Sequence, residues 1–162
     1  MNKLIATVFF IGYLKPAPGT WGSLAALPLG WALYSAGGAW LVVAATVLLF
    51  AAGIRATAFM ARETGEHDPS CVVADEVAGQ WIALLPVMFG ATAMQADVLD
   101  LWPGWVAAFV LFRLFDIWKP GPVGWADRMD TPTGVMLDDV IAGIFAALGG
   151  IVLAGVAHLW LM

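Results

Sequence analysis

The feature that most limits the fold is a stretch of 39 uncharged residues, which separates Lys15 from Arg55. A helix needs roughly 20 apolar residues to cross the hydrocarbon core of a bilayer, so this stretch can hold two crossings. Gly37-Gly38 lies near its middle, where a turn is expected. The stretch therefore predicts two membrane helices, Trp21–Ser35 and Ala39–Ile54.

Three further apolar runs follow along the chain. Val77–Ala96 is about as long as one membrane crossing, and Val140–Met162 can cross with some tilt. Leu101–Phe112 is shorter, and we expect it to continue through Arg113 to about Trp118. We therefore predict an all-α, polytopic integral membrane bundle of about five membrane helices, formed by a single domain over residues 1–162.

The composition agrees with a membrane protein and excludes several other classes. Only 12% of the residues are charged and 62% are hydrophobic, whereas a soluble domain is about one quarter charged. Too few polar groups remain to cover a soluble surface, and disorder requires low hydrophobicity. The net charge of −5 argues against a nucleic-acid partner. A single Cys excludes an intramolecular disulfide and a multi-Cys metal site.

The seven basic residues indicate how the helices are oriented. The first segment, Met1–Leu14, is short and apolar; Lys15 closes it, and the following Pro-Ala-Pro-Gly is a poor cleavage site. We favour an interfacial helix over a signal peptide there. Five crossings after residue 20 leave all the basic residues on one side, which the positive-inside rule makes cytoplasmic. Met162 would then lie outside. The basic blocks are Lys3 and Lys15, Arg55 and Arg62, and Arg113, Lys119 and Arg128.

Two pairs of adjacent acids stand at the starts of predicted membrane helices: Asp75-Glu76 and Asp138-Asp139. Ten of the twelve acidic residues fall on the predicted cytoplasmic side. A carboxylate at a helix start commonly caps the free backbone N–H groups. Two adjacent pairs exceed what capping requires, and acids at a membrane boundary are costly unless they are paired or bind a cation. Capping and metal binding therefore both stay open.

Two further motifs suggest anion binding. Arg113, Asp116 and Lys119 are spaced three apart, so they share one helix face before Pro120 ends the helix. They form either a salt-bridge ladder or a stripe that offers cations to a phosphate and a carboxylate to a metal. Pro18-Gly19-Thr20-Trp21-Gly22-Ser23 is either an anion-binding helix start, with Thr20 and Ser23 as hydroxyl donors, or an ordinary helix start capped by Thr20.

Oxygen ligands without a Cys or His cluster favour a hard cation such as Mg²⁺. Carboxylates, a metal, Arg and Lys together form a set of groups suited to phosphoryl chemistry. The rival hypotheses are a small cation-coupled transporter or channel and a non-catalytic membrane scaffold. A transporter would need acids near the bilayer midplane and a path to the far side. A scaffold would leave the acid pairs without a role.

Taken together, these pieces resemble the phosphatidylglycerophosphatase A family of bacterial membrane enzymes. The resemblance extends in order over nearly the whole chain. Its matching positions are Pro18–Ala26, His67-Asp68, Asp75-Glu76 with Gly79, Phe112-Arg113 with Asp116, Trp118–Pro120, Pro122, Trp125, Asp127-Arg128, Gly134–Val140 and Ala142-Gly143. A departure is Thr131-Pro132-Thr133, where a more Gly-rich turn is expected.

The resemblance implies Mg²⁺-dependent hydrolysis of phosphatidylglycerophosphate to phosphatidylglycerol and phosphate, at the cytoplasmic face of the bacterial inner membrane. The phospholipid and the membrane would be the partners, and the oligomeric state is left open. Either water or a carboxylate could attack, and a metal-bound water is the simpler hypothesis. The implied metal ligands are Asp68, Asp75, Glu76, Asp116, Asp138 and Asp139, all but Asp68 also catalytic. The implied phosphate-binding cations are Arg113, Lys119 and Arg128.

Overall fold

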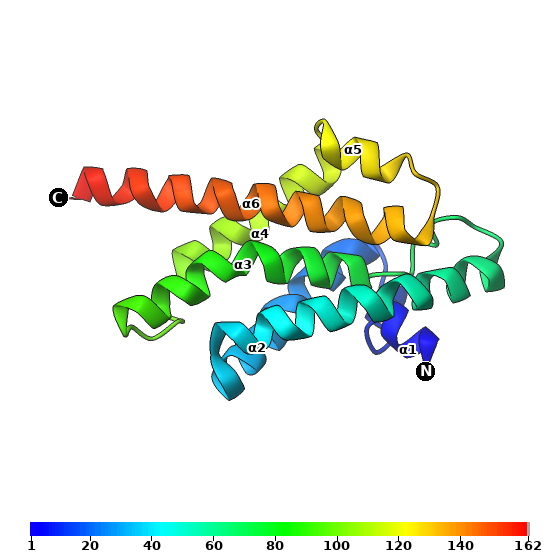
Figure 1. Cartoon of the computed structure of the whole chain (residues 1–162), viewed down its shortest axis with the longest axis horizontal. Helices are drawn as coiled ribbons and strands as arrows, with labels where there is room; N and C mark the ends of the chain where they lie inside the picture. The colour runs from blue at the N-terminus through cyan, green and yellow to red at the C-terminus, as the bar shows by residue number, and fades with distance from the viewer. Residues whose placement is uncertain (162) are drawn as a thin grey trace.

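The computed structural model describes residues 1–161. Met162, predicted from the sequence to lie on the outer side of the membrane, is outside the described range. The described chain is helical and contains no strand, which confirms the all-α prediction. Figure 1 shows an elongated bundle with the two termini at opposite ends. Its elements are α1 (Asn2–Ala6), a 3₁₀ turn η1 (Ile11–Tyr13), α2 (Pro18–Thr64), α3 (Ala74–Met94), α4 (Trp102–Trp118), α5 (Pro122–Asp127) and α6 (Pro132–Leu161).

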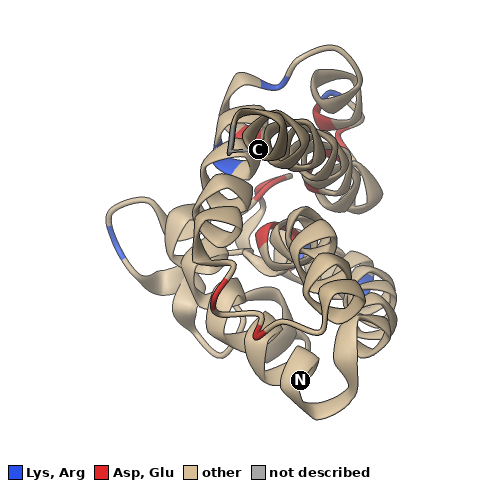
Figure 2. Cartoon of the chain, turned by 90° about the vertical axis from the view of Figure 1, so that its left-hand side faces the viewer, with Lys and Arg blue, Asp and Glu red and all other residues tan. Residues whose placement is uncertain are grey.

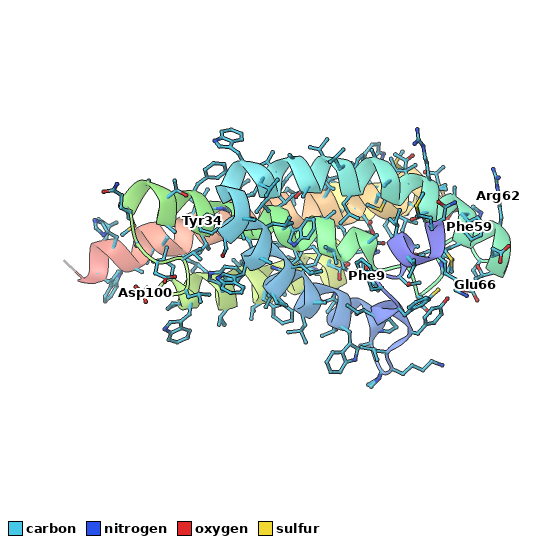
Figure 3. The ribbon with its side chains drawn as sticks, turned by 90° about the horizontal axis from the view of Figure 1, so that it is seen from below. Phe9, Tyr34, Phe59, Arg62, Glu66 and Asp100 are labelled. Carbon is cyan, nitrogen blue, oxygen red and sulfur yellow. The ribbon has the colours of Figure 1, made fainter. Side chains whose placement is uncertain are left out.

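α2 is broken where the sequence predicted a turn. Gly37 and Gly38 have non-helical backbone angles, and Gly38 has a φ of 71°, which glycine adopts without steric cost. We call residues 18–36 the first arm and residues 39–64 the second arm. Figures 1 and 3 show the two arms running back alongside one another, so the predicted pair of helices is present. The second arm continues past Arg55 to Thr64, where Gly65 ends it with a φ of 75°.

Within the described residues, three helices are long and apolar enough to cross a membrane: α2, α3 and α6. The predicted count of five membrane helices is therefore not confirmed. The difference arises because α2 counts once despite its break and because α4 has only 17 residues. The N-terminal segment is less regular than predicted, since α1 has five residues and a short 3₁₀ turn follows it.

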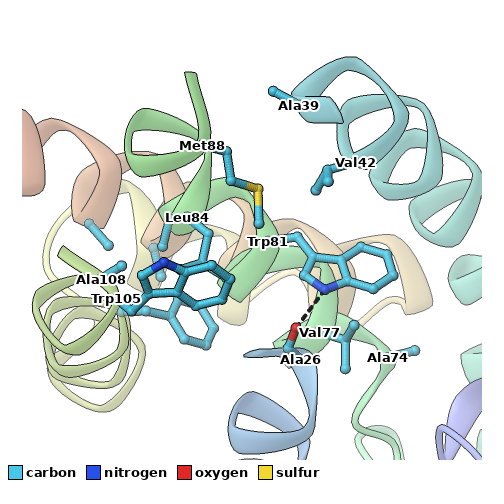
Figure 4. Packing of buried hydrophobic residues seen from close by; sticks show 14 of the residues in the cluster. Ala26, Ala39, Val42, Ala74, Val77, Trp81, Leu84, Met88, Trp105 and Ala108 are labelled. Carbon is cyan, nitrogen blue, oxygen red and sulfur yellow. Dashed lines mark hydrogen bonds between the residues drawn. The ribbon is translucent and has the colours of Figure 1, made fainter. Parts of the chain in front are cut away.

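The packed core lies between the arms of α2 and helices α3, α4 and α6. Leu84, Met88 and Phe112 are fully buried in this core. Figure 2 shows that most of the residues along the bundle are neither acidic nor basic. The indole N–H of Trp81 donates to the backbone oxygen of Ala26 at 2.9 Å, as Figure 4 shows. This bond satisfies a buried polar group and links α3 to the first arm.

The start of α6 differs from the prediction. The helix begins at Pro132, so Asp138 and Asp139 lie inside it and do not open it. Thr131 explains the earlier start, because its hydroxyl accepts the backbone N–H of Gly134 at 3.0 Å and its carbonyl accepts that of Val135. Proline directly after such a cap suits the first turn of a helix. The Thr-Pro-Thr departure from the Gly-rich turn is therefore a capped helix start.

Candidate active site

A cavity of about 220 Å³ lies where α2, α3 and α6 begin and α4 ends. It gathers residues from four helices and from the loop before α3, although long stretches of sequence separate them. The side chains and backbone that line it come from Pro18, Gly19, Asp68, Ser70, Val72, Asp75, Glu76, Arg113, Asp116, Lys119, Val135, Asp138 and Asp139. All six predicted metal-side acids and two of the three predicted cations therefore meet in one place.

Three of these acids form a tight group at the contact between α3 and α6. Asp75, Glu76 and Asp139 each offer a carboxylate oxygen, and these oxygens lie within 4.8 Å of one another. Asp75 is 6% exposed and Asp139 is 3% exposed, so water screens their mutual repulsion poorly. Oxygen Oε2 of Glu76 is buried and has no hydrogen-bond partner among the described residues. Such an arrangement is suited to an oxygen-coordinated cation.

Helix capping accounts for little of either acid pair. The N-cap of α3 is Val73, and no side chain caps that helix. Asp75 lies in the first turn of α3, where its carboxylate accepts the N–H of Glu76 at 3.0 Å. Asp138 accepts the N–H of Asp139 at 2.9 Å well inside α6. The capping interpretation is therefore wrong for Asp138-Asp139, and at α3 it applies to one N–H group only.

Arg113 bridges α4 to the first arm. Its Nη1 lies 2.7 Å from Asp116 Oδ2 and 3.3 Å from the hydroxyl of Ser23. Ser23 is fully buried and itself donates to the carbonyl of Gly19 at 2.9 Å. Ser23 therefore accepts a hydrogen bond from the guanidinium but does not itself line the cavity.

Lys119 does not continue the predicted ladder. Its ammonium lies 2.9 Å from Asp138 Oδ2 and also contacts the carboxylate of Asp127. The backbone explains why: Lys119 has a φ of 49°, so it leaves the helical path that would align it with Asp116. Only the link between Arg113 and Asp116 of the ladder is present in the described structure.

The surroundings of Lys119 and Asp68 shift their pKa values. Burial lowers the pKa of Lys119, but hydrogen bonds and the charges of Asp127 and Asp138 outweigh it and raise the pKa above its ordinary value. Lys119 is therefore a firmly charged cation. The carboxyl of Asp68 lies on an exposed loop but faces the cavity, and its partial burial raises its pKa, with Lys119 opposing the rise.

Besides Ser23, two further residues predicted to bind phosphate do not line the cavity. Arg128 is exposed just after α5 and does not line the cavity. Thr20 is half-buried within the first arm, where it neither lines the cavity nor caps the helix, because α2 already begins at Pro18 with Ala17 as its N-cap.

Sequence reasoning missed several residues at or beside the site. Ser70 lines the cavity and was not singled out, whereas Gly19, which also lines it, belonged to the predicted anion-binding turn. Gln80 is fully buried one helical turn beyond Glu76, and neither atom of its amide has a partner among the described residues. An amide within an apolar run, four residues after an acid, is the signal that could have singled out Gln80. Asp127 was part of the family resemblance but received no role.

Comparison with known proteins identifies the family. The sequence model described as Phosphatidylglycerophosphatase A matches residues 4–154, which is most of the chain. The chain belongs to this family. The matched range includes every residue of the cavity lining.

Two relatives carry the family's name. Phosphatidylglycerophosphatase A of Haemophilus influenzae is 38% identical over 147 residues, which cover 90% of this chain and 83% of the relative. The Escherichia coli K12 protein of the same name is 38% identical over 153 residues, covering 89% and 78%. A Bacteroides thetaiotaomicron protein, provisionally named phosphatidylinositol-3-phosphatase, is 41% identical over 148 residues, covering 88% and 87%. No solved structure matches the chain.

Proposed function

We propose that this protein hydrolyses phosphatidylglycerophosphate to phosphatidylglycerol and inorganic phosphate. Membership of the phosphatidylglycerophosphatase A family and the names of two relatives support this activity. The observation that carries the proposal is the single cavity in which six carboxylates meet Arg113 and Lys119. Acids for a metal and cations for an anion, side by side, are the groups that phosphate-ester hydrolysis requires.

The residues present fit Mg²⁺. Asp75, Glu76 and Asp139 provide a closely spaced set of oxygen ligands, and Glu76 has a buried oxygen free to bind. Asp68, Asp116 and Asp138 line the same cavity and complete the proposed acid shell. Mg²⁺ held by these residues would neutralise phosphate charge and favour deprotonation of a bound water.

The cations of the cavity would bind the phosphate. Arg113 offers a planar guanidinium suited to two phosphate oxygens, and Lys119 offers a point charge. Both groups would stabilise the charge that develops on the phosphoryl oxygens in the transition state. Since Arg128 and Thr20 do not line the cavity, we assign them no contact with the phosphate.

The reaction breaks the bond between phosphorus and the glycerol oxygen and forms a new bond from a water oxygen to phosphorus. We infer that a cavity carboxylate accepts a proton from the attacking water. The departing glycerol oxygen takes up a proton, which leaves phosphatidylglycerol and inorganic phosphate. Asp116 is ion-paired with Arg113, and Asp138 with Lys119.

We further propose five membrane crossings: the two arms of α2, then α3, α4 and α6. Figure 3 shows Arg62 and Glu66 at one end of the bundle, with Tyr34 and Asp100 at the other. The basic blocks favour a cytoplasmic position for the end with the cavity, by the positive-inside rule. The acids of the cavity gather near one end of the helices, which does not favour the transporter alternative.

The decisive experiment measures phosphate release from short-chain phosphatidylglycerophosphate by the purified protein, with Mg²⁺ and with excess EDTA. We expect release only with Mg²⁺. Phosphatidylinositol 3-phosphate, tested in parallel, reports on the activity named for the Bacteroides relative. Absence of phosphate release from phosphatidylglycerophosphate at saturating Mg²⁺, by folded protein, would contradict the proposed function.

A further inference from the structure

Lys119 has a backbone conformation that is uncommon for a residue other than glycine. It ends α4 in the left-handed region, with a φ of 49° and a ψ of 53°, and its backbone N–H donates to the carbonyl of Phe115. Its side chain thereby turns from the α4 stripe toward α6, where the ammonium meets Asp138. The side chain is 31% exposed, so Lys119 lies at the edge of the cavity.

A short helix delivers a second carboxylate to the same ammonium. α5 begins directly after the turn that follows Lys119 and ends at Asp127. It packs against α6 and buries Val123 and Ala126. Gly124 lies so close to Lys119 that a Cβ there would stand 2.7 Å from the Lys119 carbonyl oxygen. This close packing fixes Asp127 relative to Lys119.

The Lys119 ammonium has one more hydrogen-bond donor than its two carboxylate partners use. An ammonium has three N–H donors, and Asp127 and Asp138 accept two of them. One donor is left for a third oxygen. Asp138 lines the cavity and belongs to the proposed metal shell, so its carboxylate has a second proposed role. Asp127 does not line the cavity and can hold the ammonium from outside.

We propose that Asp127 is a positioning residue, which holds the Lys119 ammonium at the cavity edge so that its remaining N–H binds a substrate phosphate oxygen. This inference rests on the proposed function. The competing explanation is an ordinary surface ion pair, since the Asp127 side chain is 42% exposed. Exposed pairs contribute little to stability, so the two explanations predict different kinetics.

A double-mutant cycle tests the proposal, with Asp127→Asn, Lys119→Met and the double variant assayed on short-chain phosphatidylglycerophosphate. We expect Asp127→Asn to lower kcat/KM about tenfold, or ~1.4 kcal/mol, mainly through a higher KM. In the Lys119→Met background the Asp127→Asn change should have no further effect, because the ammonium that Asp127 positions is absent. Asp127→Glu should recover part of the loss. Asp130→Asn is the matched control, because Asp130 is an exposed acid of the loop after α5 and forms no ion pair in the described structure.

A second readout does not depend on turnover: binding of inorganic phosphate to the Mg²⁺-loaded protein, measured by calorimetry. Asp127→Asn and Lys119→Met should weaken phosphate binding alike, with melting temperatures near that of the unsubstituted protein. The positioning role is overturned if Asp127→Asn stays within twofold in both assays, or if its effect multiplies with that of Lys119→Met. If no variant, nor the starting protein, releases phosphate from the lipid, the proposed function fails, and the calorimetric comparison still decides the role of Asp127.

Discussion

Gly79 of α3 lies directly against the backbone carbonyl of Asp139 in α6: a Cβ on Gly79 would stand 2.5 Å from that oxygen. The same Cβ would stand 2.5 Å from the ring of Phe112 in α4. Small residues allow membrane helices to approach closely, and here the approach has a consequence for the site. Glu76 lies one turn before Gly79, so the contact sets the distance between Glu76 and Asp139.

Gly79→Ala should therefore damage both packing and the site. Overpacking of this kind costs about 1–3 kcal/mol, and any separation of α3 from α6 pulls the three clustered acids apart. We expect a lower melting temperature in detergent and weaker activation by Mg²⁺. Gly90→Ala on the same helix is the control, since a Cβ there meets nothing within 4 Å. Equal behaviour of the two variants would show that the close contact is unimportant.

Asp139→Asn tests the metal assignment. Ligand binding stabilises a protein by about 2.7 kcal/mol at one hundred times the dissociation constant, so Mg²⁺ should raise the melting temperature of the unsubstituted protein. The variant should lose this rise and its phosphatase activity. Without Mg²⁺ it should melt no lower, because the change removes one of three crowded acids. Asp100→Asn, at the far end of the bundle, should keep both responses. A full Mg²⁺-induced rise in Asp139→Asn would remove Asp139 from the metal site.

The sequence predicted the helices and the gathering of acids for simple reasons. Uncharged runs mark apolar helices, and Gly37-Gly38 interrupts the longest run where the chain turns back. Antiparallel helices then bring the start of α3, the end of α4 and the first third of α6 to the same end of the bundle. Because successive helices run in opposite directions, Asp75, Asp116 and Asp139 are expected at the same end of the bundle.

Other features depend on contacts that spacing along the chain does not reveal. The start of α6 was misplaced because the limits of an uncharged run were taken for helix limits, whereas Thr131 and Pro132 begin the helix earlier. The ladder through Lys119 assumed a continuous helix, but the positive φ of Lys119 turns it toward Asp138. Ser23 was expected to bind phosphate directly, but its hydroxyl contacts Arg113.

Gln80→Met should leave the fold intact or stabilise it. The Gln80 amide is fully buried and has no partner among the described residues, and an unsatisfied buried group costs about 1–3 kcal/mol. Met has a similar length and removes that cost. Melting temperature and Mg²⁺ activation, measured on one preparation, check the prediction. A marked fall in both would show that the amide takes part in the site through a bound water or ion.

Membrane sidedness follows from the five proposed crossings. Arg62 and Asp100 lie at opposite ends of the bundle and are both exposed (Figure 3). In a background lacking Cys71, Arg62→Cys and Asp100→Cys should react with a membrane-impermeant thiol reagent from opposite sides of the membrane. In intact cells we expect labelling of the second variant alone. Labelling of both from outside would contradict the five-crossing arrangement.

Arg113 provides the sharpest test of phosphate binding. If its contact with Asp116 were only a helical ion pair, it would contribute roughly 0.2–0.5 kcal/mol, and Arg113→Lys would be nearly silent. A guanidinium that binds two phosphate oxygens cannot be replaced by an ammonium. Loss of such a contact costs about 1.5–3 kcal/mol, or on the order of ten- to a hundredfold in kcat/KM.

We therefore expect Arg113→Lys to lower kcat/KM by that factor while the melting temperature changes little. Lys119→Arg should be milder, because it keeps a charged donor at a position that needs only a point charge. Arg62→Lys, an exposed exchange outside the cavity, is the matched control. Steady-state kinetics of the three variants decide between the two roles. If Arg113→Lys had the same kcat/KM as Arg62→Lys, the guanidinium would not bind the phosphate through two oxygens. Lys119 would then be the cavity cation left to bind the phosphate.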